Sequence, residues 1–146
     1  MASAACCDTS FLFSLYGRDG HTADAASIMR QFGQPLSVTV LNEFELVNAL
    51  QLAVFRRSLD ALAARTILAA FERDLTVGKL VEENCNLADV VATAKELSIL
   101  HTAIGGYRSF DIMHIATALR LNAGAFITFD IRQKALAASA GLPTMP

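Results

Sequence analysis

The stretch Ala4-Ala5-Cys6-Cys7-Asp8-Thr9-Ser10-Phe11-Leu12 decides the fold of this chain. Its first four residues form an apolar run that is too short and too early to be anything but a buried strand. Asp8 stands where this strand gives way to a helix. In open parallel α/β sheets, ligands bind beyond the carboxyl ends of the strands. The stretch therefore predicts a carboxylate at the functional edge of a sheet.

The same pattern returns near the other end of the chain, in Ala125-Phe126-Ile127-Thr128-Phe129-Asp130. Here too, an apolar run leads into a hydroxyl residue and an aspartate. Parallel strands that each end in an aspartate bring their carboxylates to one edge of the sheet. We therefore expect Asp8 and Asp130 to begin a metal site.

The composition is that of a folded chain. Of the 146 residues, 53% are hydrophobic and 18% are charged, which excludes disorder and predicts helices buried on more than one face. The length predicts one domain over residues 1–146. The net charge of -2 gives no bulk signal for nucleic-acid binding, so an RNA-handling protein would need clustered arginines or bridging metal ions.

The cysteines and the hydropathy pattern favour a cytoplasmic protein with no membrane partner. Cys6 and Cys7 are neighbours in a strand, so they point to opposite faces and do not easily pair. We expect both, and also Cys85, to be reduced thiols. No apolar run reaches the roughly 18 residues that a membrane span requires. The first residues also lack the positive charge of a signal peptide.

Cap and turn signals divide the chain into helices and short strands, which implies an α/β protein with a parallel sheet covered on both faces. Expected helices span residues 10–16, 22–32, a long segment after Thr39 or Asn42, 58–73, 86–103, 110–121 and 132–140. Strands are expected at 4–7, 37–40 and 125–129, with a small edge strand in 142–146 and either a loop or an edge strand at 77–83. Expected caps are Thr9 or Ser10, Thr39 or Asn42, Ser58, Asn86, Ser109 and Asp130.

Two further acids lie in apolar or helix-starting surroundings. Asp111 lies in Arg108-Ser109-Phe110-Asp111-Ile112-Met113-His114-Ile115-Ala116. Glu45 lies in Leu41-Asn42-Glu43-Phe44-Glu45-Leu46-Val47-Asn48-Ala49-Leu50, where Glu43 is its competitor on a different helix face. Taken singly, each acid has a structural explanation as a cap, a first-turn residue or a solvated helix residue.

Taken together, the four acids favour a metal site. Packed carboxylates repel one another, and the pKa of at least one rises unless a cation lies among them. Mg²⁺ and Mn²⁺ prefer such oxygen ligands, whereas the acid-only set argues against zinc. An ion of this kind activates water and stabilises the leaving oxygen of a phosphodiester.

In their order along the chain, these motifs resemble those of PIN-domain proteins, in particular the bacterial VapC-like branch. The matching segments are Asp8-Thr9-Ser10-Phe11-Leu12, the segment that begins at Glu45, Arg108-Ser109-Phe110-Asp111 with the residues to Ala116, and Thr128-Phe129-Asp130. Each motif is weak alone, but four in order and at the proper distances are specific. The similarity covers essentially the whole chain.

The resemblance implies a three-layer α/β/α fold, with a short central parallel sheet surrounded by about seven helices. It implies a Mg²⁺- or Mn²⁺-dependent ribonuclease, often the toxin of a toxin–antitoxin pair, which forms homodimers and binds a small antitoxin beside its active site. By position, Asp8, Glu45, Asp111 and Asp130 match the acidic quartet. Thr128 matches the hydroxyl before the last acid, and Thr9 lies next to the first. Whether Asp130 binds the ion directly or through water stays open.

Three neighbouring residues allow two interpretations each. Asn48 either orients Glu45 or is a helix-packing amide. Arg108 either contacts a phosphate or forms a plain ion pair. His114 is favoured as a hydrogen-bonded core residue over a ligand or general base, because its neighbours are apolar. His21 carries no functional signal.

We therefore expect a metal-dependent endoribonuclease in which a bound water attacks phosphorus. The alternative is a catalytically weak PIN-fold module that binds RNA or an antitoxin-like protein. A haloacid-dehalogenase-type phosphatase is rejected, because Ser10 occupies the position where that class has a second aspartate.

Overall fold

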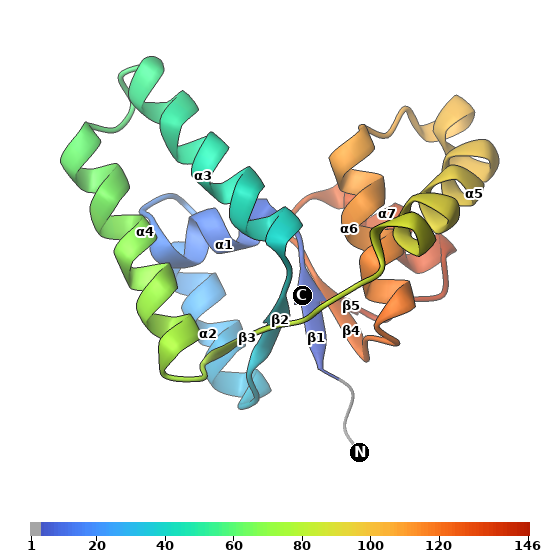
Figure 1. Ribbon diagram of the computed structural model, residues 1–146, viewed down its shortest axis with the longest axis horizontal. Helices are drawn as coiled ribbons and strands as arrows, with labels where there is room; N and C mark the ends of the chain where they lie inside the picture. The colour runs from blue at the N-terminus through green and yellow to red at the C-terminus, as the bar shows by residue number, and fades with distance from the viewer. Residues whose placement is uncertain (1–3) are drawn as a thin grey trace.

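The computed structural model describes residues 4–146, which form a central sheet of short strands with helices on both sides (Figure 1). The strands are β1 (Ala5–Cys7), β2 (Leu36–Val38), β3 (Leu80–Glu82), β4 (Ala125–Ile127) and β5 (Thr144–Met145). The helices are α1 (Thr9–Tyr16), α2 (Thr22–Phe32), α3 (Val40–Phe55), α4 (Ala61–Thr76), α5 (Leu87–Gly105), α6 (Ser109–Arg120) and α7 (Ile131–Ser139). The expected α/β/α fold is confirmed.

The sheet is parallel, and its strand order is β3-β2-β1-β4-β5. The first strand is therefore central, although its neighbour β4 comes near the end of the chain. Ala5 pairs with Ala125 and Cys7 with Ile127. Because the last residues of these two strands are paired, Asp8 and Thr128, which follow them, lie next to each other at the carboxyl edge of the sheet.

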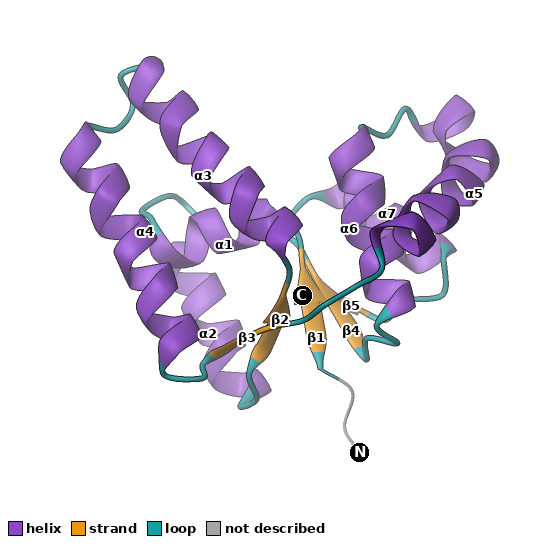
Figure 2. Cartoon of the chain, in the orientation of Figure 1, coloured by secondary structure: helices purple, strands orange, loops and turns teal. Residues whose placement is uncertain are grey.

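Helices α1–α4 cover one face of the sheet and α5–α7 cover the other (Figure 2). Side chains along β1 alternate between the two cores. Ala5 and Cys7 pack under the first layer, with Phe11 and Phe71, whereas Cys6 packs under the second. The expected opposite orientation of Cys6 and Cys7 is thus confirmed.

Three predicted caps are wrong, and two of them belong to α1 and α6. Asp8, not Thr9 or Ser10, caps α1, because its Oδ1 accepts a hydrogen bond from the Phe11 N–H at 3.0 Å. The chain leaves β1 one residue earlier than the hydroxyl residues suggest, and a carboxylate caps as well as a hydroxyl does. Ser109 is the first residue of α6, and the residue before it makes no side-chain cap bond.

The cap of α4 also differs from the prediction. Asp60 fills this position and accepts a hydrogen bond from the Ala63 N–H at 2.7 Å. Ser58 instead donates its hydroxyl hydrogen to the Ala53 carbonyl, at 3.1 Å, and so closes the end of α3. The expected Asn86 and Asp130 caps are confirmed.

Local hydrogen bonds also set the strand limits. The expected strand over 37–40 is shorter, because Thr39 already precedes α3 and donates its N–H to Asn42 Oδ1 at 3.0 Å. The undecided segment 77–83 contains edge strand β3, and the expected tail strand is β5. No helix in residues 4–146 is long and apolar enough to span a membrane.

Phe126 is fully buried in the centre of the sheet, so we expect Phe126→Ala to lower the free energy of unfolding by about 3–5 kcal/mol. Urea unfolding followed by circular dichroism measures this change. Phe55→Ala is the matched control: its ring is 82% exposed, and it should change stability by less than about 0.5 kcal/mol. Equal effects of the two substitutions would contradict the assigned core.

Candidate active site

The structure brings all four predicted acids to one cavity of about 770 Å³. Asp8 follows β1, and Asp130 follows the neighbouring strand β4. Glu45 comes from the second turn of α3, and Asp111 from the first turn of α6. Acids that are far apart in the sequence therefore line a shared space at the carboxyl edge of the sheet.

Asp8 is the most buried of these acids, at 4% exposed. Its Oδ2 accepts hydrogen bonds from Ser10 Oγ at 2.5 Å and from Thr128 Oγ1 at 2.9 Å. Burial raises the pKa of Asp8, although these hydrogen bonds, the Phe11 N–H and His114 act in the opposite direction. A buried carboxylate of this kind is stabilised by any cation that enters the cavity.

Thr128 connects the two aspartates that follow strands. The residue is fully buried, and its hydroxyl donates to Asp8 Oδ2 while accepting from the Asp130 N–H at 3.0 Å. Asp130 Oδ1 in turn accepts from the N–H groups of Arg132 at 2.9 Å and Gln133 at 3.2 Å, at the start of α7. One threonine thus fixes the relative positions of two acids that β1 and β4 deliver.

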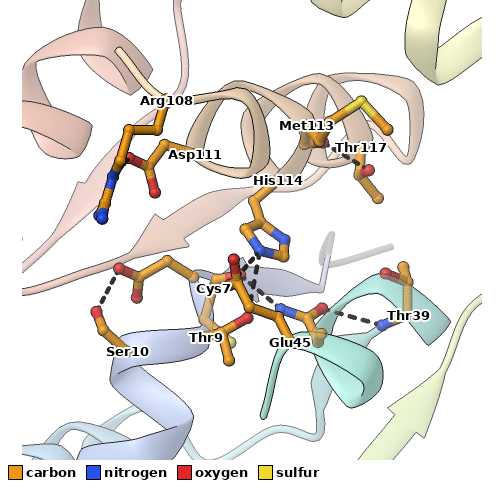
Figure 3. Close-up of polar contacts among 12 residues, drawn as sticks. Cys7, Thr9, Ser10, Thr39, Glu45, Arg108, Asp111, Met113, His114 and Thr117 are labelled. Atoms are coloured by element: carbon orange, nitrogen blue, oxygen red, sulfur yellow. Dashed lines mark hydrogen bonds and ion pairs between the residues drawn. The ribbon is translucent and has the colours of Figure 1, made fainter. Parts of the chain in front are cut away.

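Glu45 is held by a buried histidine (Figure 3). His114 Nε2 lies 2.9 Å from Glu45 Oε1 and 3.2 Å from Thr9 Oγ1. Because an ionised carboxylate only accepts hydrogen bonds, Nε2 carries the hydrogen. Burial works to raise the pKa of Glu45, but the hydrogen bonds from His114 and Thr9 and the charges of His114 and Arg108 outweigh it, so the pKa is lowered. The structure agrees with the interpretation of His114 as a hydrogen-bonded core residue.

Asp111 forms an ion pair with Arg108, whose Nε lies 3.2 Å from Asp111 Oδ2. The Arg108 side chain is 82% exposed, so this pair contributes little stability and leaves the guanidinium accessible. The structure thus shows an ion pair at Arg108, and its contact with a phosphate stays a prediction. Asn48 lines the cavity wall, while Glu45 takes its hydrogen bond from His114.

The cavity fits a hard divalent cation by the chemistry of its donors, which are carboxylate and hydroxyl oxygens. Of the residues described along its wall, five are acidic, and Arg108 is the one lysine or arginine. In residues 4–146, however, no three His, Cys, Asp or Glu side chains converge on a common metal-ligand position. The reason is that the carboxylates face their own partners: Glu45 faces His114, Asp111 faces Arg108, and Asp130 faces the start of α7.

Sequence reasoning missed several residues of this cavity. Ser10, weighed only as a cap, binds the buried Asp8 carboxylate. His21 and Phe129 line the cavity with stacked rings, and Asp19 lies beside them. A serine two residues after a strand-end aspartate is a local signal that could have identified Ser10. The position of His21 depends on contacts with a strand end more than 100 residues away, for which the sequence holds no local signal.

Comparisons with known proteins agree with this architecture. The family model described as PIN domain matches residues 5–139, and the chain therefore belongs to the PIN-domain family. PIN domains are typically nucleases. No curated protein matches the sequence at a significant level.

Two solved structures share the fold. VapBC2 from Rickettsia felis, bound to a DNA fragment from its promoter, has a TM-score of 0.69 at 14% identity, and the match covers 97% of each chain. PAE2754 from Pyrobaculum aerophilum has a TM-score of 0.62 at 21% identity, with 99% of this chain and 85% of that chain covered. At these identities the likeness shows the fold alone.

Proposed function

We propose that the protein is a metal-dependent endoribonuclease. The observation that carries this proposal is the presence of four carboxylates around one cavity of a PIN domain, with Asp8 buried among them. A buried carboxylate whose pKa is raised by burial is unfavourable for stability alone, and such groups are frequent at functional sites. The oxygen-only donor set favours Mg²⁺ or Mn²⁺.

In this proposal, Asp8, Glu45 and Asp111 hold the cation, and Asp130 binds it directly or through water. When bound, the ion activates water and stabilises the leaving oxygen of a phosphodiester. The other side chains hold these ligands in place. Ser10 and Thr128 fix one oxygen of Asp8, while His114 and Thr9 both hold the carboxylate of Glu45. Arg108 is exposed enough to exchange Asp111 for a substrate phosphate.

We further propose that this nuclease is the toxin of a VapBC-like pair, acts in the cytoplasm as a homodimer, and is restrained by a small antitoxin. The shared fold with VapBC2 supports this setting. Large apolar side chains are exposed on several helices and are available for contact with protein partners. Examples are Phe55 on α3, Leu62 on α4, Ile104 on α5 and Ile131 on α7.

The direct test compares two glutamates of one helix. With Mn²⁺, purified wild-type protein should cleave RNA, and a chelator should stop the cleavage. Glu45→Gln should lose most of this activity, because the amide cannot replace the anion. Glu43→Gln should keep it, because Glu43 does not line the cavity. Equal activity of the two variants would contradict the assigned site, and use of Glu43 as the matched control excludes a general effect on α3.

Thermal unfolding with Mn²⁺ separates the enzyme from the alternative, a catalytically weak interaction module. An ion that binds the folded chain only should raise the free energy of unfolding by about 2.7 kcal/mol at 100 times its Kd. For a chain of this size, the melting temperature should rise by roughly 5–10 °C. No shift, together with no cleavage of any RNA tested, would favour the interaction module, to which the lack of convergence among the carboxylates also points.

A further inference from the structure

Three aromatic rings form a ladder that leads from the core to the cavity. Phe11 is fully buried, and its ring centroid lies 5.7 Å from that of the half-buried Phe129. The Phe129 ring then stacks on exposed His21, with centroids 4.4 Å apart and an angle of 11° between the ring planes. The ladder thus ends in a flat, solvent-exposed ring on the wall of the cavity that Asp130 also lines.

The loop that carries His21 is held in place by its own hydrogen bonds. Asp19 Oδ1 accepts from the His21 N–H at 2.8 Å, and Asp19 Oδ2 accepts from Ser14 Oγ at 2.7 Å. Thr22 Oγ1 donates to the Ser14 carbonyl, also at 2.7 Å. Because the loop is fixed on α1 before any ligand arrives, binding against His21 costs little conformational entropy.

Besides the proposed cation and Arg108, stacking is a further way for this acidic cavity to hold a nucleic acid. Five acidic residues line it against one arginine, so a phosphate backbone gains little from the side chains. Stacking between a nucleobase and an aromatic ring does not need a positive surface, and it operates for every base. A base is therefore best held at the exposed end of the ring ladder.

We propose that His21, supported by Phe129, is a stacking subsite for one unpaired nucleobase of a single-stranded RNA. The proposal rests on the ribonuclease function and adds to its site a residue that binds the substrate through a base. Only an unpaired base offers a free face to the ring, since the bases of a duplex are already stacked on their neighbours. His21 and Asp130 line the same cavity, so the base that the ring holds would belong to the RNA strand bound at the acidic site.

Cleavage kinetics test this subsite. His21→Ala should raise KM for single-stranded RNA on the order of ten-fold and leave kcat nearly unchanged, because base stacking contributes to binding. His21→Phe should restore KM, since it restores a flat ring. His101→Ala, a histidine substitution outside the cavity, should change neither constant. An unchanged KM in His21→Ala, or a His21→Phe variant as impaired as His21→Ala, would overturn the proposal.

Fluorescence gives a second test that does not depend on cleavage. The chain contains no tryptophan, so His21→Trp introduces a single reporter. The measurement uses Ca²⁺ in place of Mn²⁺, because Ca²⁺ takes the same oxygen ligands. Single-stranded oligoadenylate should quench the fluorescence of this tryptophan, and the same strand annealed to oligouridylate should not. Ile99→Trp, on α5 and 80% exposed, should not respond to either.

The two tests fail in different ways. Cleavage of RNA without quenching and without a change in KM would refute the subsite while leaving the ribonuclease function intact. Quenching by single strands without any cleavage would support the subsite and refute the enzymatic function. Equal quenching by single and double strands would also overturn the proposal, because the ring would then not select an unpaired base.

Discussion

Replacing Asp8 by asparagine should abolish metal-dependent RNA cleavage without weakening the metal-free fold. The amide removes the most buried anion of the cavity, and we expect the rate to fall on the order of 100- to 1,000-fold. The amide oxygen can still accept the Phe11 N–H that caps α1. The hydroxyls of Ser10 and Thr128 can rotate to accept from the amide nitrogen.

The effect of Asp8→Asn on the free energy of unfolding should depend on pH, because the fold raises the pKa of Asp8. Burial raises this pKa above its ordinary value of 3.8. Its contribution to stability is therefore complete below that value and is lost as the pH rises through the folded-state pKa. Asparagine has no such loss, so Asp8→Asn should become increasingly more stable than wild type as the pH rises through this window. Urea unfolding in a chelator, between about pH 3 and pH 8, measures the difference.

Asp60→Asn is the matched control for this substitution. Asp60 also caps a helix through its carboxylate, but it is exposed and does not line the cavity. It should retain full cleavage activity. If Asp8→Asn cleaved RNA as fast as wild type, Asp8 would not belong to the site. If the metal-free variant lost more than about 2 kcal/mol in the free energy of unfolding, the assigned effect of burial would be wrong.

The second large effect is expected at His114, which holds Glu45 and Thr9 through one ring nitrogen. His114→Ala removes this contact from both partners and leaves a cavity beneath α6. We expect a loss of about 2–4 kcal/mol in the free energy of unfolding. We also expect a loss of about 10- to 100-fold in Mn²⁺ affinity or cleavage, as is typical when the partner of a metal ligand is removed.

The conservative variant separates positioning from simple folding. His114→Gln keeps an N–H donor, so it should recover Mn²⁺ affinity, measured by calorimetry, more fully than His114→Ala does. His101→Ala should affect neither property, because it does not line the cavity. If His114→Gln and His114→Ala bind Mn²⁺ equally, with both still folded, His114 does not position Glu45.

The parts of the site that follow strands could be predicted from the sequence. Asp8 and Asp130 each come directly after an apolar run, and this local pattern determines which edge of the sheet they occupy. Asp111 and Glu45 are singled out by their apolar or helix-starting surroundings and by the order of the motifs that contain them. The expected helix ends at residues 16 and 32 are also confirmed, and each is followed by a glycine, Gly17 and Gly33.

The contacts around these acids could not be predicted, because they join distant segments. His114 and Glu45 are 69 positions apart, and Thr9 and His114 are 105 apart. Apolar neighbours predict that His114 is buried, but not which carboxylate it meets. His21 lies in a polar loop, and only the fold brings its ring onto Phe129. The predicted cap of α1 was wrong for a simpler reason. Aspartate and serine are equally good N-caps, and the residue at which the strand ends decides which of them fills the position.

The pairing of β1 with β4 has a consequence for biosynthesis. A growing polypeptide presents Asp8 early, but Thr128 and Asp130 arrive only after most of the chain has been translated. Pairing between such distant segments is slow to form. The four carboxylates therefore cannot line one cavity until residues 125–130 have been synthesised and have paired with the first strand.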